Sequence, residues 1–92
     1  MIVSFRDEDT RKLAMGFRVV RFIAFERAAR RKLRQLDIAG NLEDLKIPPG
    51  NRLERLRGDR GGLFSIRIND QWRICFEWTA AGAKEVEIVD YH

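Results

Sequence analysis

The spacing of the apolar residues changes once along this chain of 92 residues, close to Gly50. Before that point apolar residues recur every three or four positions, which is the pattern of an amphipathic helix. These residues are Phe22, Phe25, Ala29, Leu33 and Leu36. After Gly50 apolar and polar residues alternate, as they do in half-buried strands. The chain is therefore predicted to have an α+β fold, with its helices before its strands.

The helical half carries recognisable start and stop signals. Asp7 is a good N-cap, and acidic residues follow it in the first turn. Gly16 is a C-terminal breaker, so the first helix is expected to be short. A second helix is predicted from Phe22 to Leu36. The sequence Pro48-Pro49-Gly50 is expected to exclude any regular element between the two halves of the chain.

Strands are expected at residues 52–57, 63–69, 72–78 and 85–91, and residues 2–5 are a candidate for one more. The turns between the later strands are short, so these strands must pair antiparallel. The predicted architecture is two N-terminal helices packed on one face of a small, mainly antiparallel sheet. The opposite face is expected to be polar and open to water. The candidates for that face are Arg67, Arg73, Glu77 and Tyr91.

The charge pattern indicates an anionic partner. Lysine and arginine number 18 against 14 acidic residues, and 14 of the 18 cations are arginine. The planar guanidinium matches pairs of phosphate oxygens, so nucleic acid is the first candidate partner. Four arginines gather around the turn after Gly50, a density that suits a phosphate track. They are Arg52, Arg55, Arg57 and Arg60. The alternative is a solvated surface with internal ion pairs.

Composition narrows the class of protein. No apolar run reaches the ~20 residues of a membrane span, and no secretory signal is visible at the start of the sequence. The single cysteine, Cys75, excludes an internal disulfide, so a reducing cytoplasm is expected. The sequence has no zinc-ligand spacing and no glycine-rich phosphate loop. We therefore expect one domain, residues 1–92, with no metal and no cofactor.

Two places hold residues suited to proton transfer and phosphate binding. Asp90, Tyr91 and His92 stand in a row after the last strand, and Arg73 lies in the middle of a strand. A charge at that position needs a carboxylate, for which Glu77 or Glu87 is the candidate, or an anionic ligand. This set of groups suits metal-free cleavage of RNA by its own 2′-hydroxyl. The alternatives are an ion-paired arginine and a disordered tail.

Three stretches together resemble the HigB toxins of the RelE/ParE toxin superfamily, also called plasmid-maintenance killer proteins. They are residues 56–60 (LRGDR), 65–76 (SIRINDQWRICF) and 89–92 (VDYH). The resemblance implies a RelE-like fold and a ribosome-dependent mRNA endonuclease that cuts the codon in the A site of the 70S ribosome without a metal. It also implies a HigA-type helix-turn-helix antitoxin, and binding to operator DNA only through the toxin–antitoxin complex.

The resemblance also assigns roles to residues. The catalytic group it implies is Arg57, Arg73, Asp90, Tyr91 and His92. The residues expected to contact RNA are Glu54, Arg55, Arg60, Arg67 and Gln71. Some family members carry a histidine where this chain has Glu54. The alternative functions are a non-catalytic RNA-binding module and a superfamily toxin with another target, such as gyrase.

Overall fold

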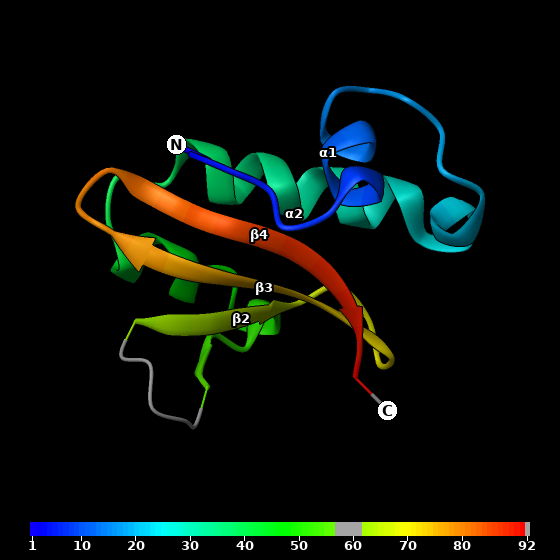
Figure 1. Cartoon of the computed structure of the whole chain (residues 1–92). Helices are drawn as coiled ribbons and strands as arrows, with labels where there is room; N and C mark the ends of the chain where they lie inside the picture. Colours follow the sequence, from blue (N-terminus) through cyan, green and yellow to red (C-terminus); the bar gives the residue numbers. More distant parts are fainter. Residues whose placement is uncertain (57–61, 92) are drawn as a thin grey trace.

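The computed structural model describes residues 1–56 and 62–91. Helical segments come first and a four-stranded sheet follows, which confirms the predicted α+β class (Figure 1). The helical segments are α1 (Glu8–Ala14), η1 (Val20–Phe25), α2 (Glu26–Ile38), η2 (Leu42–Lys46) and η3 (Pro49–Asn51). The strands are β1 (Glu54–Arg55), β2 (Leu63–Arg67), β3 (Trp72–Thr79) and β4 (Gly82–Asp90). None of the described helices has the length and apolar character that a bilayer crossing requires.

The short first helix is held at both ends by the signals in its sequence. At its start, the Asp7 carboxylate accepts a hydrogen bond of 3.0 Å from the backbone N–H of Thr10. At its end, Gly16 adopts φ 98°, and the N–H of Phe17 reaches back to the carbonyl of Lys12 at 2.9 Å. This pairing is the usual way in which a left-handed residue closes a helix. The predicted limits of α1 are confirmed.

The second helix differs from its prediction in its first turns. Residues 20–25 form a 3₁₀-helix, and the α-helix begins only at Glu26. In a 3₁₀-helix residues three apart lie one above the other. Phe22 and Phe25 have this spacing, and both rings pack on Trp72 of β3, with centroids at 5.8 and 4.8 Å. The tighter turn thus places both aromatic rings on the sheet.

The connector between the helices and the sheet also departs from expectation. Pro49–Asn51 forms one 3₁₀ turn, where no regular element was predicted. Proline is tolerated at the start of a helix because its missing N–H would have no partner there. The turn ends at Arg52, which has the left-handed values φ 45° and ψ 57°. This geometry directs the chain from the helical layer into β1.

All four strands pair antiparallel in the order β1-β2-β3-β4. The strand expected over residues 52–57 is reduced to Glu54–Arg55. The last strand starts at Gly82, earlier than predicted, and contains an irregularity at Glu85, whose φ is 55°. An extra residue at such a bulge shifts the alternation of side chains. Ala83 and Val86, three positions apart, are therefore both fully buried.

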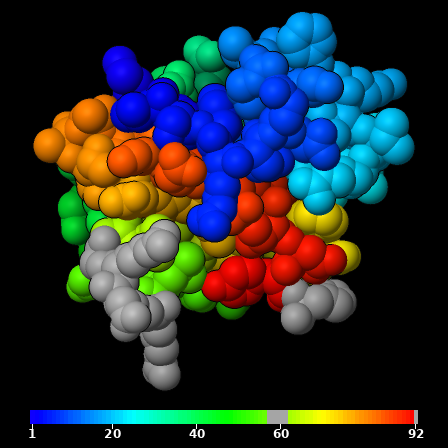
Figure 2. All heavy atoms as spheres, in the orientation of Figure 1, coloured from blue at the N-terminus to red at the C-terminus, as the bar shows by residue number. Residues whose placement is uncertain are grey.

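The N-terminal segment lies along the outer edge of β4 (Figure 2). Ile2 and Phe5 form parallel bridges with Ala83 and Val86. The extra strand anticipated over residues 2–5 is thus present only as isolated bridges. Since unpaired strand edges invite association with other chains, this segment protects β4.

The core lies between the helices and one face of the sheet (Figure 1). Leu33 and Leu36 of α2 meet the sheet residues Ile66, Ile74 and Ile88, all at most 3% exposed. The predicted packing of the helices on one face is confirmed. We call the opposite side of the sheet the Arg73 face. It comprises Glu54, Ser65, Arg67, Arg73, Cys75, Glu87 and Tyr91.

Candidate functional site

Arg73 stands at the centre of the Arg73 face. Its strand register places it between Arg67 of β2 and Val89 of β4. The side chain was expected to be open to water, but the residue is only 7% exposed. Its Nε donates to the hydroxyl of Ser65 at 2.9 Å, and its Nη2 donates to the carbonyl of Arg52 at 2.5 Å. The guanidinium is buried because the segment that enters β1 lies over it.

In the described part of the chain, the carboxylate that pairs with Arg73 is that of Glu54, and the contact is long. Glu54 Oε1 lies 3.7 Å from Nη1, and the Glu54 side chain is half exposed. The sequence suggested Glu77 or Glu87 as the carboxylate that pairs with Arg73, and this prediction is wrong. Glu54 is opposite Ser65 in the β1–β2 register, whereas Glu87 lies 3.8 Å from Arg6. An ion pair this long and this exposed contributes little, so most of the positive charge remains available to an anion.

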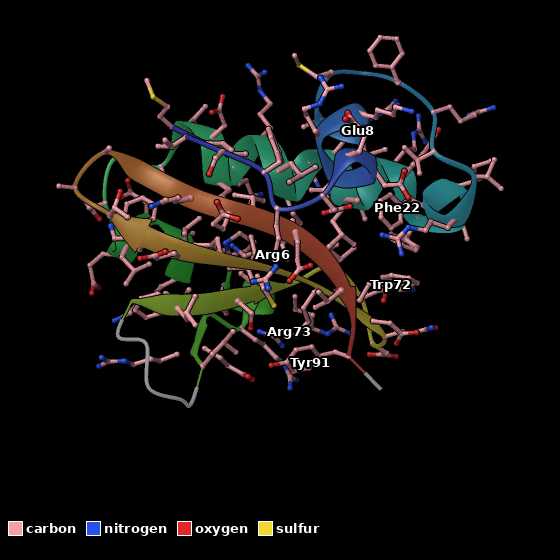
Figure 3. The ribbon with its side chains drawn as sticks, viewed as in Figure 1. Arg6, Glu8, Phe22, Trp72, Arg73 and Tyr91 are labelled. Atoms are coloured by element: carbon pink, nitrogen blue, oxygen red, sulfur yellow. The ribbon has the colours of Figure 1, made fainter. Side chains whose placement is uncertain are left out.

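Tyr91 covers the other side of the guanidinium. The backbone N–H of Tyr91 donates to the carbonyl of Gln71 at 2.6 Å, which holds the end of the chain against β3. The tyrosine ring lies 5.6 Å from the Cζ atom of Arg73, within the range of a cation–π contact (Figure 3). Tyr91 itself is 46% exposed. A cation and a phenol therefore share one accessible place on the sheet.

Asp90 and Gln71 meet next to Tyr91. Gln71, in the turn that joins β2 to β3, donates from its Nε2 to Oδ2 of Asp90, the last residue of β4, at 3.0 Å. Asp90 is opposite Trp72 in the β3–β4 register. Successive strand residues point to opposite faces, so Asp90 projects away from the Arg73 face while Tyr91 projects toward it. The structure thus brings Asp90 and Tyr91 to one edge of the sheet, with Tyr91 on the same side as Arg73 and Asp90 on the other side.

Some of the other predicted site residues lie near Arg73, and others do not. Arg67 is directly opposite Arg73 and forms an ion pair with the exposed Asp70. Arg55 is opposite Phe64, in the row of the sheet that faces the core, and so does not lie beside Arg73. Arg57, Arg60 and His92 lie outside the described residues. Of the predicted RNA-contacting set, Glu54, Arg67 and Gln71 are placed around Arg73 and Tyr91.

Arg6 is a cation that the sequence analysis missed. Its side chain extends from the N-terminal segment over the sheet on the side of Arg73 and Tyr91 (Figure 3). It is 58% exposed, and its Nε lies 3.8 Å from Glu87 Oε1. No local pattern marks this residue. Its position depends on the bridge between Phe5 and Val86, which joins the two ends of the sequence.

Cys75 is beside Arg73 on the same face, but its thiol is unsuited to nucleophilic attack. Burial, reinforced by the carboxylate of Glu87, raises the pKa of Cys75 to about 11, although Arg73 acts in the opposite direction. The thiolate is the reactive form of cysteine, and a thiol with this pKa is protonated near neutral pH. The chemistry of this face therefore depends on its arginines, its tyrosine and the nearby carboxylates.

The residues of the Arg73 face do not line the largest described groove. That groove, of about 410 Å³, lies elsewhere, between α1, α2 and the N-terminal segment, and is lined by residues such as Leu13, Met15 and Leu33. Arg73 and Tyr91 do not line it. Within residues 1–56 and 62–91, no cluster of three or more His, Cys, Asp or Glu side chains is arranged to hold a metal ion. A ligand of this face must reach it along the sheet.

A family model described as the RelE-like toxin HigB of type II toxin–antitoxin systems matches residues 4–92. The chain belongs to the HigB-like toxin family. Two relatives show the same likeness over shorter stretches. This HigB-like chain is 51% identical over 55 residues to the toxin HigB-1 of Vibrio cholerae. It is 38% identical over 48 residues to an uncharacterised protein of Haemophilus influenzae.

The matched stretches span 60% and 52% of this HigB-like chain. They span 58% and 48% of the two relatives. The chain therefore spans about half the length of the curated relatives that it matches. The family model, by contrast, extends over both Arg73 and Tyr91. The Arg73 face is thus formed from the portion of the chain that the family model matches.

Proposed function

We propose that this HigB-like chain is a ribosome-dependent mRNA endonuclease that cleaves the codon in the ribosomal A site without a metal. In this reaction the 2′-oxygen of a ribose attacks the adjacent phosphorus, and the bond to the 5′-oxygen of the next nucleotide breaks. A base removes the proton of the 2′-hydroxyl, and an acid returns a proton to the leaving 5′-oxygen. The products are a 2′,3′-cyclic phosphate and a 5′-hydroxyl end.

The observation that carries this proposal is the environment of Arg73. Its guanidinium is held by the neutral oxygens of Ser65 and Arg52, with the carboxylate of Glu54 3.7 Å away. Charge builds up on the phosphoryl oxygens as the 2′-oxygen attacks. A fixed cation in a water-poor place stabilises that charge without having to reorganise. Arg73 is therefore assigned to the scissile phosphate, together with Arg57 as the resemblance to HigB toxins implies.

The proton transfers are assigned to Asp90, Tyr91 and His92. Tyr91 is supported by its position, because its ring lies over the guanidinium of Arg73. Asp90 accepts a hydrogen bond from Gln71 at the same edge of the sheet. A phenol beside a fixed cation lies close to any phosphate that the cation binds, which suits a group that must exchange a proton with the substrate.

The position of Arg73 and Tyr91 on one side of a sheet supports dependence on the ribosome. RNA laid on a surface is free to move, and a ribosome-bound codon is already immobilised, which reduces the entropy that catalysis must overcome. Arg6, Arg67 and Gln71 surround Arg73 and Tyr91 and are proposed to contact the neighbouring nucleotides, with Gln71 reading a base. Free mRNA should be cut slowly, and the reaction takes place where ribosomes work, in the cytoplasm.

The partners follow from family membership. A type II toxin is paired with an antitoxin, and we propose that this one is of the HigA type, with a helix-turn-helix fold. In that case operator DNA is bound only through the toxin–antitoxin complex.

Arg73→Ala and Tyr91→Phe test the proposal on programmed ribosomes with end-labelled mRNA. Arg73→Ala should lower kcat by about 30- to 1,000-fold, or roughly 2–4 kcal/mol of transition-state stabilisation. Tyr91→Phe keeps the ring over the guanidinium and removes only the hydroxyl, so the loss should be in kcat with KM little changed. The exposed Arg27 of α2 provides a control, since Arg27→Ala also removes one arginine.

The end groups and the response to the variants separate the competing functions. The proposal requires a 5′-hydroxyl on the downstream fragment. A non-catalytic RNA-binding module would inhibit translation equally well with Tyr91→Phe, and a gyrase poison would leave mRNA intact on the ribosome. Rapid cleavage of isolated mRNA, or full activity in Arg73→Ala, would contradict the proposed mechanism.

A further inference from the structure

Lys32 is a buried cation without a nearby carboxylate among the described residues. It lies on α2 within the helix face that packs against the core, and it is only 9% exposed. Burial, reinforced by the positive charges of Arg31 and Arg67, lowers the pKa of Lys32. Burying an unpaired ammonium is costly. The position therefore calls for an explanation that core packing does not provide.

The bond that Lys32 makes is to Asn51. Its Nζ donates to Asn51 Oδ1 at 2.5 Å, and Asn51 is fully buried. The amide nitrogen of Asn51 faces the oxygens of Gln35, Leu45 and Ile47 at 3.1–3.4 Å. Because an ammonium can only donate, it requires an oxygen opposite it, which fixes the orientation of the amide. Lys32 and these three oxygens together fix one of the two flipped states of Asn51.

The next residue transmits this orientation to the Arg73 face. Arg52 follows Asn51 in the left-handed conformation, at φ 45°, which costs a residue with a side chain about 1 kcal/mol. Its carbonyl accepts the 2.5 Å hydrogen bond from Arg73 Nη2. The structure therefore contains a continuous series of short bonds. It runs from the Lys32 ammonium through Asn51 and the Arg52 carbonyl to the guanidinium of Arg73.

We propose that Lys32 is a positioning residue for Arg73, acting from the helix side of the sheet through Asn51 and the carbonyl of Arg52. This inference rests on the proposed function, in which Arg73 stabilises the scissile phosphate. Ser65 fixes the Nε side of the guanidinium, and the series from Lys32 fixes the Nη2 side. A guanidinium bound on one side only can rotate away from the phosphate, and a misplacement of 1 Å costs about 100-fold in rate.

The test variant is Lys32→Met, which keeps an unbranched apolar side chain of nearly the same volume and removes the donor. It should lower kcat on programmed ribosomes by about 10- to 100-fold and leave KM within about threefold. Arg31→Met is the matched control, because it removes the same charge from the adjacent, exposed position. In an Arg73→Ala background, Lys32→Met should have no further effect, since a residue that acts through another loses its effect with it.

A second measurement needs no catalysis. In the free protein, the Arg73 Nε–H resonance should exchange with solvent about tenfold faster or more in Lys32→Met, and should be unchanged in Arg31→Met. If wild-type protein fails to cut A-site mRNA, the proposed function fails, while this exchange rate still decides the positioning role. Should Lys32→Met not fold, Lys32→Gln, whose amide is one bond too short to reach Asn51, replaces it in both measurements.

Three results would overturn the inference. The first is wild-type kcat and wild-type Arg73 exchange in a folded Lys32 variant. The second is a loss of kcat that adds to that of Arg73→Ala. The third is a rise in KM at unchanged kcat, which would make Lys32 a charge that attracts RNA and not one that orients Arg73.

Discussion

Arg73 and Lys32 are buried cations whose closest hydrogen-bond partners are neutral oxygens. Arg73 bonds to a hydroxyl and a carbonyl, and Lys32 bonds to an amide. Neutral acceptors satisfy N–H donors without cancelling the charge. A carboxylate at hydrogen-bond distance would stabilise the folded state more, but it would also compete with a phosphate. The arrangement thus favours anion binding over stability.

The raised pKa of the Cys75 thiol predicts how the free energy of unfolding changes at alkaline pH. Its pKa is raised from the usual 9.0 to about 11, so the folded state holds the proton more tightly than the unfolded state. The resulting stability is fully present below pH 9 and is lost as the pH rises through 11. By linkage the loss has an upper bound of about 3 kcal/mol, and the partial exposure of Cys75 to solvent makes it smaller. The variant Cys75→Ala should lack this loss of stability.

Urea unfolding of wild type and Cys75→Ala at pH 8 and at pH 10.5 measures this effect. The quantity to compare is the difference in the free energy of unfolding between the two proteins, which should change from one pH to the other. That difference isolates the thiol from Lys32, which titrates in an overlapping range with the opposite sign. The lowered pKa of Lys32 adds stability as pH rises from its folded-state value toward 10.5. A difference between wild type and variant that does not change with pH would contradict the raised pKa of Cys75.

At the scale of elements, α1 is an example of structure determined locally. Its N-cap bond and its C-terminal glycine both lie within a few residues of the helix. Such signals act through short-range geometry, so a sequence pattern predicts them well. The 3₁₀ start of the second helix is different. It depends on Trp72, which is remote in sequence and becomes a neighbour of Phe22 only when the sheet has formed.

Gly16 and Gly50 provide a matched pair for testing the end of α1. An added Cβ would meet no atom within 4 Å at either position, but only Gly16 has a positive φ, of 98°. Gly16→Ala should therefore lower the free energy of unfolding by about 1 kcal/mol through backbone strain alone. Gly50→Ala should be neutral or slightly stabilising. Chemical denaturation compares the two, and equal effects would show that the left-handed residue does not limit the helix.

At the scale of the whole molecule, the N-terminal segment joins the helical layer to the last strand. The backbone N–H groups of Val3 and Arg6 donate to carbonyls of Ala83 and Val86 at 2.6 and 2.9 Å. This pairing covers the outer edge of β4 and carries Arg6 over the Arg73 face. Sheet protection and site assembly thus depend on the same contacts between the two ends of the sequence.

Gly82 makes this close approach possible. A Cβ at this position would lie 2.2 Å from the carbonyl oxygen of Met1, and the φ of Gly82 is 128°. Gly82→Ala should displace the segment, destabilise the fold by about 2 kcal/mol or more, and increase the amide exchange of Val3 and Arg6. Gly40→Ala is the control, because its nearest neighbour would be a side-chain oxygen at 3.7 Å. Unchanged protection of Val3 in Gly82→Ala would contradict the role assigned to Gly82.

The fold class, the caps of α1, the antiparallel order of the strands and the core residues Val86 and Ile88 could all be predicted from the sequence alone. They follow from the periodicity of side chains and from short connections, which act between residues close in the chain. The choice of Arg73 and Tyr91 as site candidates also came from the sequence, and their catalytic roles stay predictions. So does the single-domain assignment of residues 1–92.

Only the tertiary structure determined that Arg73 is buried, that Glu54 and not Glu77 or Glu87 is its carboxylate neighbour, and that Arg6 and Lys32 bear on the same site. Each of these facts depends on backbone segments that are distant in sequence and meet through strand register or through the η3 turn. The alternation of polar and apolar residues shows which face a side chain takes. It does not show which segment lies over that face, because the covering segment is placed by packing across the whole molecule.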